Sequence, residues 1–313
     1  MQCFHSDRFM VPLPAGHRWP APKSRLLRER VAVECPGIRL QEAIAATDGE
    51  LALAHEPDWI GAVRDGTLSE AQQRELGLSW SPELAERARR SVGATIGAAR
   101  AALGEGFAAQ LAGGSHHAHA DRGSGWCVFN DVAVAARLMQ AEWHRHHRRL
   151  LRVAVIDLDV HQGDGTAAIF RDDPTVFTMS LHAQKNFPAR KQASDLDVAL
   201  ADGCTDGPYL SALEAALARL WAAHAQTPPG LVLYVAGADP HEHDRLGRLG
   251  LTAHGLAERD RRVLAECGAR GIPVVVVMAG GYGRRMDETV AIHFNTIVES
   301  LHAWRSLNDR AAA

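Results

Sequence analysis

The sequence predicts an α/β fold in which a parallel β-sheet is covered by helices on both faces. Several stretches, such as 152–160 and 230–239, are apolar almost throughout, as strands buried on both faces are. They alternate with longer segments that have the spacing of amphipathic helices. The 313 residues include 46% hydrophobic and 23% charged side chains, enough to bury a large core. Because we find no internal repeat or linker, we expect residues 1–313 to form a single domain.

The expected elements follow one another as a helix-covered parallel sheet requires. The first helix spans 81–110, because this stretch is rich in alanine, with Ser79 or Ser81 as a cap and Pro82 in the first turn. The later elements are a helix at 131–147, strands at 152–160 and 175–182, a helix at 209–225, a strand at 230–239, a helix at 254–271, a strand at 272–283 and a helix at about 287–306. In such sheets, functional groups collect at the carboxyl ends of the strands.

Composition and charge argue against several classes of protein. The net charge of −3 does not suggest a surface that binds nucleic acid. The longest apolar run, 273–281, is too short to span a membrane, and the N-terminal residues have no secretory pattern. The five cysteines are scattered and odd in number, which favours a reduced, cytoplasmic compartment. We therefore expect neither a nucleic-acid nor a membrane partner, and nothing in the sequence indicates an oligomeric state.

Acidic residues and one histidine crowd into the sequence VIDLDVHQGDG at 155–165, which begins as a buried strand. So much charge at the end of an apolar strand must be paired or neutralised. On an extended chain, Asp159 and His161 point to the same side. With Asp239, which ends another predicted strand, they form a three-ligand set with open positions, which is typical of a catalytic zinc site. Taken alone, the motif also fits a loop ion pair or a magnesium site.

Two adjacent histidines, His116 and His117, lie in the glycine-containing stretch 113–131. A neutral histidine near a metal-activated water can act as a general base. Its second ring nitrogen needs a carboxylate partner, and Asp157 and Asp164 are candidates for this role.

Tyr282 lies between glycines at the end of the last predicted strand. Its phenol group can donate a hydrogen bond to an oxyanion that develops during a reaction. Each of these motifs is common by itself. Because they occur together, each after a predicted strand or in a loop, they favour a single catalytic site at one edge of the sheet.

The motifs GGSHHAHADRGSGWCVFND, VIDLDVHQGDG, SLH, AGAD and AGGYG resemble those of the histone deacetylase superfamily of zinc-dependent amidohydrolases. The resemblance extends from PLPAGHRWP to the last helix. It is closest to class IV and to bacterial deacetylase-like proteins, because Gln162 follows the metal histidine and GADPHEHDRLGRLGLTAHGL is similar to the class IV pattern. The resemblance implies an arginase-like α/β fold, with an eight-stranded parallel sheet between helical layers.

The resemblance also implies roles for single residues. The implied zinc ligands are Asp159, His161 and Asp239, and the implied catalytic groups are His116 with Asp157, His117 with Asp164, and Tyr282. Fe²⁺ suits the same ligands. Gly125 would accept the substrate amide N–H, while Trp126 and Phe187 would wall an acyl-lysine tunnel. Trp126 departs from the family, which usually has phenylalanine there.

The implied reaction is the removal of acetyl or longer acyl groups from an acylated amine, either an acyl-lysine or an acylpolyamine. The family often binds a structural potassium ion as well. The residues that would hold it here are Asp157, Asp159, His161, Ser180 and Leu181.

The segment PHEHD at 240–244 is expected near the tunnel mouth, and the related pattern usually has a small residue at His243. We expect Glu242 and Asp244 to make this rim acidic and to attract cationic substrates. Two other functions remain open. One is a two-metal ureohydrolase on the same fold, and the other is an acyl-ligand sensor without catalysis. The spacing of His161 and Asp164 and the retention of Tyr282 favour deacylation over both.

Overall fold

The computed structural model describes residues 1–9, 11–14 and 16–312, so positions 10, 15 and 313 of the predicted domain lie outside the described residues. The described residues form an eight-stranded sheet in which neighbouring strands are parallel. In sheet order the strands are β2 (Arg39–Glu42), β1 (Gln2–His5), β3 (Phe107–Gln110), β8 (Val274–Met278), β7 (Leu231–Ala236), β4 (Val153–Asp157), β5 (Val176–Ala183) and β6 (Leu196–Leu200). The predicted fold class is therefore confirmed.

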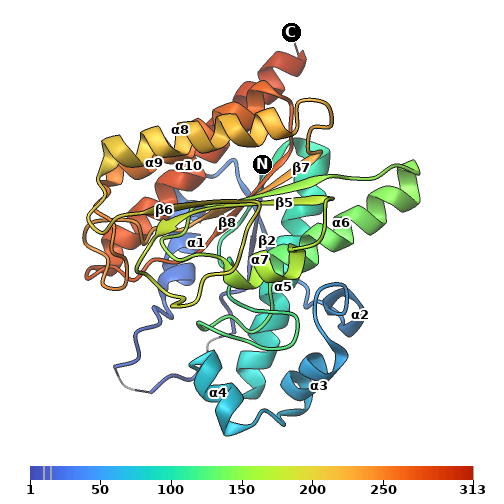
Figure 1. Ribbon diagram of the computed structural model, residues 1–313, viewed down its shortest axis with the longest axis vertical. Helices are drawn as coiled ribbons and strands as arrows, with labels where there is room; N and C mark the ends of the chain where they lie inside the picture. Colours follow the sequence, from blue (N-terminus) through green and yellow to red (C-terminus); the bar gives the residue numbers. More distant parts are fainter. Residues whose placement is uncertain (10, 15, 313) are drawn as a thin grey trace.

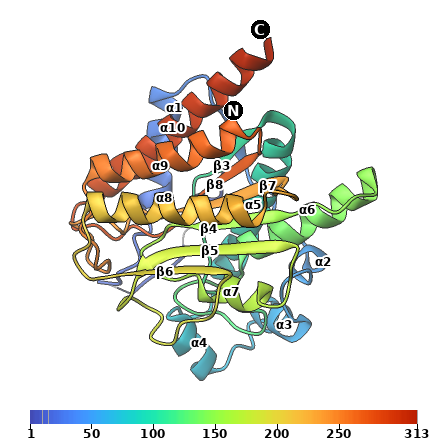
Figure 2. The ribbon, with the colours of Figure 1, turned by 45° about the horizontal axis from the view of Figure 1, so that its top comes forward.

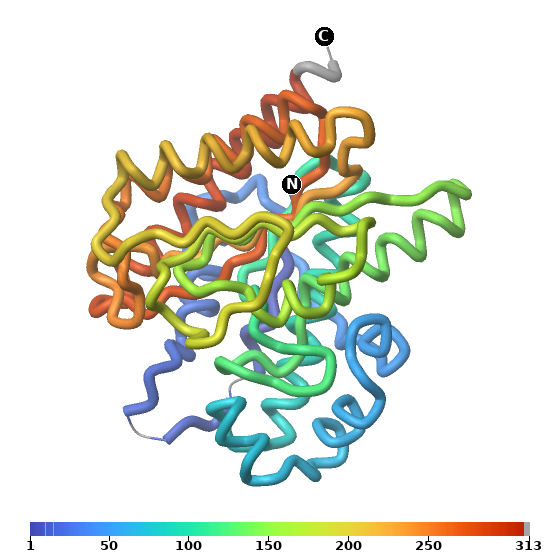
Figure 3. The backbone as a smooth tube through the Cα atoms, in the orientation of Figure 1, coloured from blue at the N-terminus to red at the C-terminus, as the bar shows by residue number. Residues whose placement is uncertain are grey.

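Helices cover both faces of the sheet (Figure 1, Figure 2). One face carries α1 (Lys23–Glu34), α8 (Asp206–Ala223), α9 (Ala253–Ala269) and α10 (Met286–Ala312). The other face carries α2 (Asp48–Leu51), α3 (Pro57–Asp65), α4 (Glu70–Leu76), α5 (Pro82–Glu105), α6 (Asp131–His147) and α7 (Asp164–Phe170). Within the described part of the chain, no helix is long and apolar enough to cross a membrane. The end of α6 and its connection to β4 project from the body (Figure 3).

The central strands are almost entirely apolar because each of their faces packs against a helical layer. In β4, Ala154 and Ile156 are buried in the core that includes α8, α9 and α10. Val153 and Val155 point the other way, into the core that includes α5 and α6. Successive side chains of a strand alternate between the two faces, so a sheet covered on both sides needs apolar residues at every position.

Four strands in the middle of the sheet, β3, β8, β7 and β4, bring the sequence motifs together. Each strand ends at the same edge, because all of them are parallel. The loop after β3 carries His116 and His117, and the loop after β8 carries Tyr282. The segments after β4 and β7 carry Asp159 and Asp239. The predicted collection of functional groups at the carboxyl ends of the strands is confirmed for these residues.

The structure differs from the predicted element order in its first hundred residues and at one edge of the sheet. The helix predicted at 81–110 ends at Glu105, and residues 107–110 form the buried strand β3. Gly106 separates the two elements with a φ of 86°, a conformation in which a glycine is favoured. The prediction contained neither the strands β1, β2 and β6 nor the helices α1 to α4 and α7. Ser81 caps α5 as expected, because its side chain accepts the Leu84 N–H.

Candidate active site

Asp159, His161 and Asp239 form one buried cluster in the folded chain. Nδ1 of His161 lies 2.9 Å from a carboxylate oxygen of Asp159 and 3.2 Å from one of Asp239. One ligand atom from each residue lies within 4.8 Å of the other two. The structure therefore brings together the three residues that the sequence offers as metal ligands.

The carboxylates of this cluster attract positive charge. Burial by itself would lower the pKa of His161, but hydrogen bonds and charge from Asp159 and Asp239 outweigh burial and raise that pKa to about 10. Burial, followed by the charge of Asp159, raises the pKa of Asp239. A proton on His161 is thus the only positive charge that the three side chains supply for two carboxylates, and a bound cation would replace it.

Two further observations indicate that the cluster fits a divalent cation. Among the described residues, the fully buried Oδ2 of Asp239 accepts no well-directed hydrogen bond, and its close polar neighbour is Nδ1 of His161 at 3.2 Å. Gly280 leaves open the space beside this oxygen, because a Cβ at position 280 would lie 1.8 Å from it. Two carboxylates and one imidazole with open positions are the donor set of a catalytic zinc or iron site.

Two histidine–carboxylate pairs lie next to the cluster. Nδ1 of His116 lies 2.7 Å from Asp157, and Nδ1 of His117 lies 2.6 Å from Asp164. Burial and then the charge of His116 lower the pKa of His117 to about 4. For His116, burial is outweighed by the charges of Asp157 and Asp159, and its pKa rises to about 9. Near neutral pH, His117 is therefore a neutral imidazole, whereas His116 is protonated.

The loop that carries the two histidines is fixed by Asp131, the first residue of α6. The Asp131 carboxylate accepts the backbone N–H groups of Gly114 and Ser115, at 3.2 and 2.8 Å, and the hydroxyl of Thr95. Gly114 has a φ of 63° and packs closely against Ala279, so a side chain at this position would be strained. The glycines around His116 are therefore needed for the path of the backbone.

Tyr282 follows β8 and faces the same site. Its ring centroid lies 6.3 Å from that of His161, and its backbone N–H donates to Asp244 at 2.6 Å. Burial, followed by the charges of Asp239 and Asp159, raises the pKa of the phenol well above its usual value. Tyr282 therefore keeps its proton and can act as a hydrogen-bond donor.

A cavity of about 540 Å³ reaches the two histidines, the metal-type cluster and Tyr282. The ring of Trp126 packs edge-on to Tyr282 with the centroids 5.4 Å apart, and Phe187 packs edge-on to His117 at 4.8 Å. Gly125 has a φ of 54°, and a Cβ there would lie 2.6 Å from His117. The structure thus places Gly125, Trp126 and Phe187 in the cavity wall.

The prediction that residues 240–244 form an acidic rim is wrong. Neither Glu242 nor Asp244 lines the cavity, whose lining instead includes Lys185 and Arg248. The Asp244 carboxylate is already engaged, because it accepts backbone N–H groups of its own loop and that of Tyr282. Sequence position alone could not reveal that this carboxylate turns inward to bond the backbone.

Three residues that support the site were missed from the sequence. Lys23, from α1, lines the cavity and donates to the carbonyl of Ala279 at 2.6 Å. His119 contributes a second imidazole to Asp164, at 3.2 Å. Arg259, fully buried in α9, donates to the carbonyls of Leu158 and Gly237, close in sequence to Asp159 and Asp239. No local motif marks any of the three, because their partners lie far away along the chain or are backbone carbonyls.

Comparison with known proteins decides the family. Residues 19–297 match the histone deacetylase domain. The chain belongs to the histone deacetylase family. The members of this family are deacetylase hydrolases, so the resemblance seen in the motifs is confirmed.

Individual relatives differ in how much they share with the chain. An uncharacterized protein of Picosynechococcus sp. is 43% identical over 93% of this chain and 94% of its own length. The acetoin utilization protein AcuC of Bacillus subtilis is 33% identical over 76% of this chain, and histone deacetylase 2 of Arabidopsis thaliana is 29% identical over 80%. The chain spans 65% of the length of each of these two relatives. The crystal structure of the HDA15 HD domain matches 98% of this chain and 93% of its own, with a TM-score of 0.77 at 21% identity, which supports the deacetylase fold.

Proposed function

We propose that this histone deacetylase family member is a metal-dependent deacylase that hydrolyses acyl groups from lysine-like amines. The observation that carries the proposal is the position of His117. It is a neutral imidazole bonded to Asp164, and its ring centroid lies 5.8 Å from that of His161 in the metal-type cluster. A base next to a metal site is the arrangement that metal-assisted hydrolysis needs.

The proposed metal ligands are Asp159, His161 and Asp239, and the proposed ion is Zn²⁺, with Fe²⁺ as the alternative. Both ions accept imidazole and carboxylate ligands. When bound, such an ion polarises the amide carbonyl and activates a water molecule for attack.

The proton steps fall to the two histidines. Nδ1–H of His117 donates to Asp164, so the Nε2 atom is free to take a proton from the attacking water and to pass it to the leaving amine. The charges of Asp157 and Asp159 raise the pKa of His116 in the metal-free protein, and a protonated His116 would supply positive charge beside the developing oxyanion. Tyr282 donates its phenol hydrogen to the same oxyanion, and the Gly125 carbonyl accepts the N–H of the substrate amide.

The shape and charge of the cavity favour acyl-lysine over acylpolyamine as the substrate. The edge-on rings of Trp126 and Phe187 suit a thin aliphatic chain. A polyamine would carry additional positive charges past Lys185 and Arg248, which line the same cavity, although Asp202 partly neutralises Arg248 at 3.1 Å. A lysine side chain, whose only amine is acylated, avoids this repulsion.

We further propose the structural potassium site beside the same strands. Asp157 of β4 pairs in register with Ser180 of β5, and Leu181 is fully buried next to it. Asp159 and His161 complete the set through the segment that follows β4. Carboxylate, hydroxyl and carbonyl oxygens are the ligands expected for a hard monovalent cation.

Gln162 and the segment after Asp239 also lead us to propose a class IV-like, bacterial type of deacetylase.

Turnover of an N-acetyl-lysine fluorogenic peptide tests the proposed function, with octanoyl- and myristoyl-lysine peptides and acetylated polyamines measured alongside. We expect a free amine and a carboxylate as products, with acyl-lysine peptides preferred. Release of urea from a guanidino substrate would instead support the ureohydrolase reaction. Tight acyl-ligand binding without turnover in zinc-loaded protein would support a sensor.

A further inference from the structure

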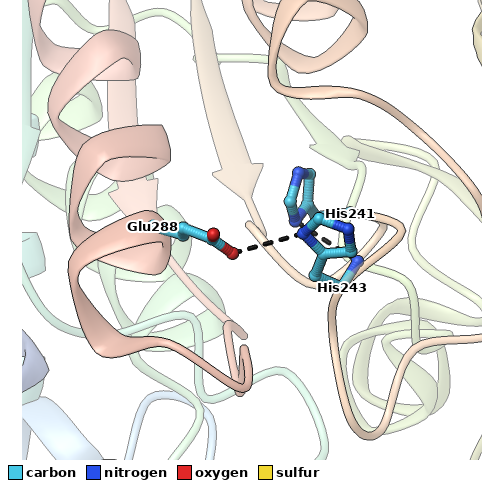
Figure 4. Close-up of side chains that lie close together, drawn as sticks. All are labelled: His241, His243 and Glu288. Atoms are coloured by element: carbon cyan, nitrogen blue, oxygen red, sulfur yellow. Dashed lines mark hydrogen bonds and ion pairs between the residues drawn. The ribbon is translucent and has the colours of Figure 1, made fainter.

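Two histidines and one glutamate form a second cluster of metal-ligating side chains, outside the candidate active site. His241 and His243 come from the loop after β7, and Glu288 comes from the first turn of α10 (Figure 4). One ligand atom from each side chain lies within 4.8 Å of the other two. We propose that this cluster is a second binding site for a transition-metal cation of the zinc class.

The positions of the three side chains favour a cation between them. Nδ1 of His243 lies 3.3 Å from Glu288, and the rings of His241 and His243 stand nearly perpendicular with their centroids 5.1 Å apart (Figure 4). Nδ1 of His241 accepts the backbone N–H of His243 at 3.4 Å, a long hydrogen bond, and a simple surface ion pair between His243 and Glu288 would not require His241 to converge on it. Two imidazoles and one carboxylate form the donor set that zinc prefers, with water as a fourth ligand.

The backbone of the loop is held before any cation binds. The N–H of Glu242 donates to the carbonyl of Leu251 at 2.9 Å, and the N–H of Arg284 donates to the carbonyl of His243 at 3.2 Å. The Asp244 carboxylate accepts two further N–H groups of the loop. Because these bonds fix the loop, little chain entropy is lost when the ligands bind a cation.

Exposure and charge leave the site open to a cation from solvent. The His243 side chain is 56% exposed and that of Glu288 is 32% exposed, while His241 is nearly buried. Arg285 lies 3.6 Å from one oxygen of Glu288, but the other oxygen is the one that faces His243. The guanidinium of Arg285 is also bonded to Asp287, which offsets its repulsion of a cation.

Occupation of this site would tie the loop to α10. Tyr282 lies in the segment that leads from β8 to α10, and its backbone N–H is bonded to Asp244 of the same loop. The site is nevertheless distinct from Asp159, His161 and Asp239, and its existence does not depend on the proposed activity.

Zinc uptake measured by equilibrium dialysis and elemental analysis of the full chain tests the proposal. We expect wild-type protein to bind two equivalents of Zn²⁺, and His243→Asn and Glu288→Gln to bind one tightly. The affinity for the second equivalent should fall by roughly tenfold or more in either variant, because a direct ligand is lost. Excess Mg²⁺ should not compete, since it prefers oxygen ligands.

Two further variants separate this site from its surroundings. His302→Asn removes an exposed histidine that lies 4.0 Å from Glu299 on the same helix, and it should still bind two equivalents. Asp159→Asn should lose the buried equivalent and keep the second one, so failure of the active-site proposal is distinguishable. The proposal is overturned if Asp159→Asn protein binds no Zn²⁺, or if His243→Asn or Glu288→Gln binds as many equivalents as the wild-type protein with unchanged affinity. The two variants alter different elements, so one of them decides the question if the other fails to fold.

Discussion

Nδ1 of His117 lies 2.6 Å from the carboxylate of Asp164, a residue 47 positions further along the chain. This contact determines which ring nitrogen of His117 is protonated and leaves the other one facing the cavity. His116 has an equivalent contact with Asp157, yet the pKa values of the two histidines move in opposite directions. The difference arises because both Asp157 and Asp159 act on His116, whereas the charge of His116 itself acts on His117.

This asymmetry predicts different roles for the two histidines. His117→Ala should lower turnover by roughly a hundredfold or more, the usual effect of losing a general base, and His116→Ala should be milder. Because His117 accepts a proton only when neutral, the wild-type rate should fall as the pH drops toward 4. Steady-state rates across pH, with zinc content measured for each variant, check this. Equal losses in both variants would contradict the assignment.

Tyr282→Phe removes only the phenol hydroxyl at the candidate site. Turnover should fall by roughly a hundredfold, while zinc content and the midpoint of urea unfolding stay at wild-type values. Tyr209→Phe is a matched control, because Tyr209 is buried in α8 and does not line the cavity. Near-normal turnover in Tyr282→Phe would exclude the tyrosine from the mechanism.

We expect Lys23 to help bind the carboxylate product of the reaction. It lines the cavity together with Arg18 and Arg87, and these three basic residues favour the binding of an anion. Burial lowers the pKa of Lys23 to about 8. Inhibition by acetate should therefore weaken as the pH rises through 8, and Lys23→Met should weaken it at every pH and remove this pH dependence. Inhibition constants for acetate, compared between the two proteins, measure the effect. Unchanged acetate inhibition in Lys23→Met would contradict this role.

Metal-free protein should lose stability in alkali. In the folded state His116 and His161 have pKa values of about 9 and 10, above the value of 6.5 expected for an unfolded histidine. The folded chain therefore binds more protons than the unfolded chain between these values, and its free energy of unfolding falls as the pH rises from about 6.5 to 10. Urea unfolding of chelator-treated protein checks this, and added Zn²⁺ should reduce the decline. A stability that rises over this range would show that the histidines are not held as described.

The central sheet could be predicted from the sequence, because β4, β7 and β8 are buried on both faces. Their residues are apolar or aromatic except for Asp157, the last residue of β4. The edge strand β6 could not, since its middle residues are exposed or half-buried and break the pattern. β3 was missed because FAAQ continues the alanine-rich composition of α5, and only Gly106 separates them.

In the candidate site, too, residues in local motifs could be predicted, whereas residues held by distant contacts could not. Asp159, His161 and Tyr282 were found because each lies in a short motif at the end of a strand. Lys23 was not, because its partner Ala279 lies 256 positions away and offers only a backbone carbonyl. The inward turn of Asp244 is likewise set by tertiary hydrogen bonds and not by its neighbours in sequence. That residues 1–313 act as one catalytic domain stays a prediction.

Turnover of an acetyl-lysine peptide as a function of zinc bound per chain shows most clearly whether the buried cluster is a catalytic metal site. The measurement is best made in His243→Asn protein, in which only the buried site should bind zinc tightly. Chelator-treated protein should be inactive, and turnover should rise in proportion to Zn²⁺ until one equivalent is bound. Asp239→Asn should neither retain that zinc nor recover activity. Full turnover in metal-free protein, or in Asp239→Asn, would show that the buried cluster is not the catalytic metal site.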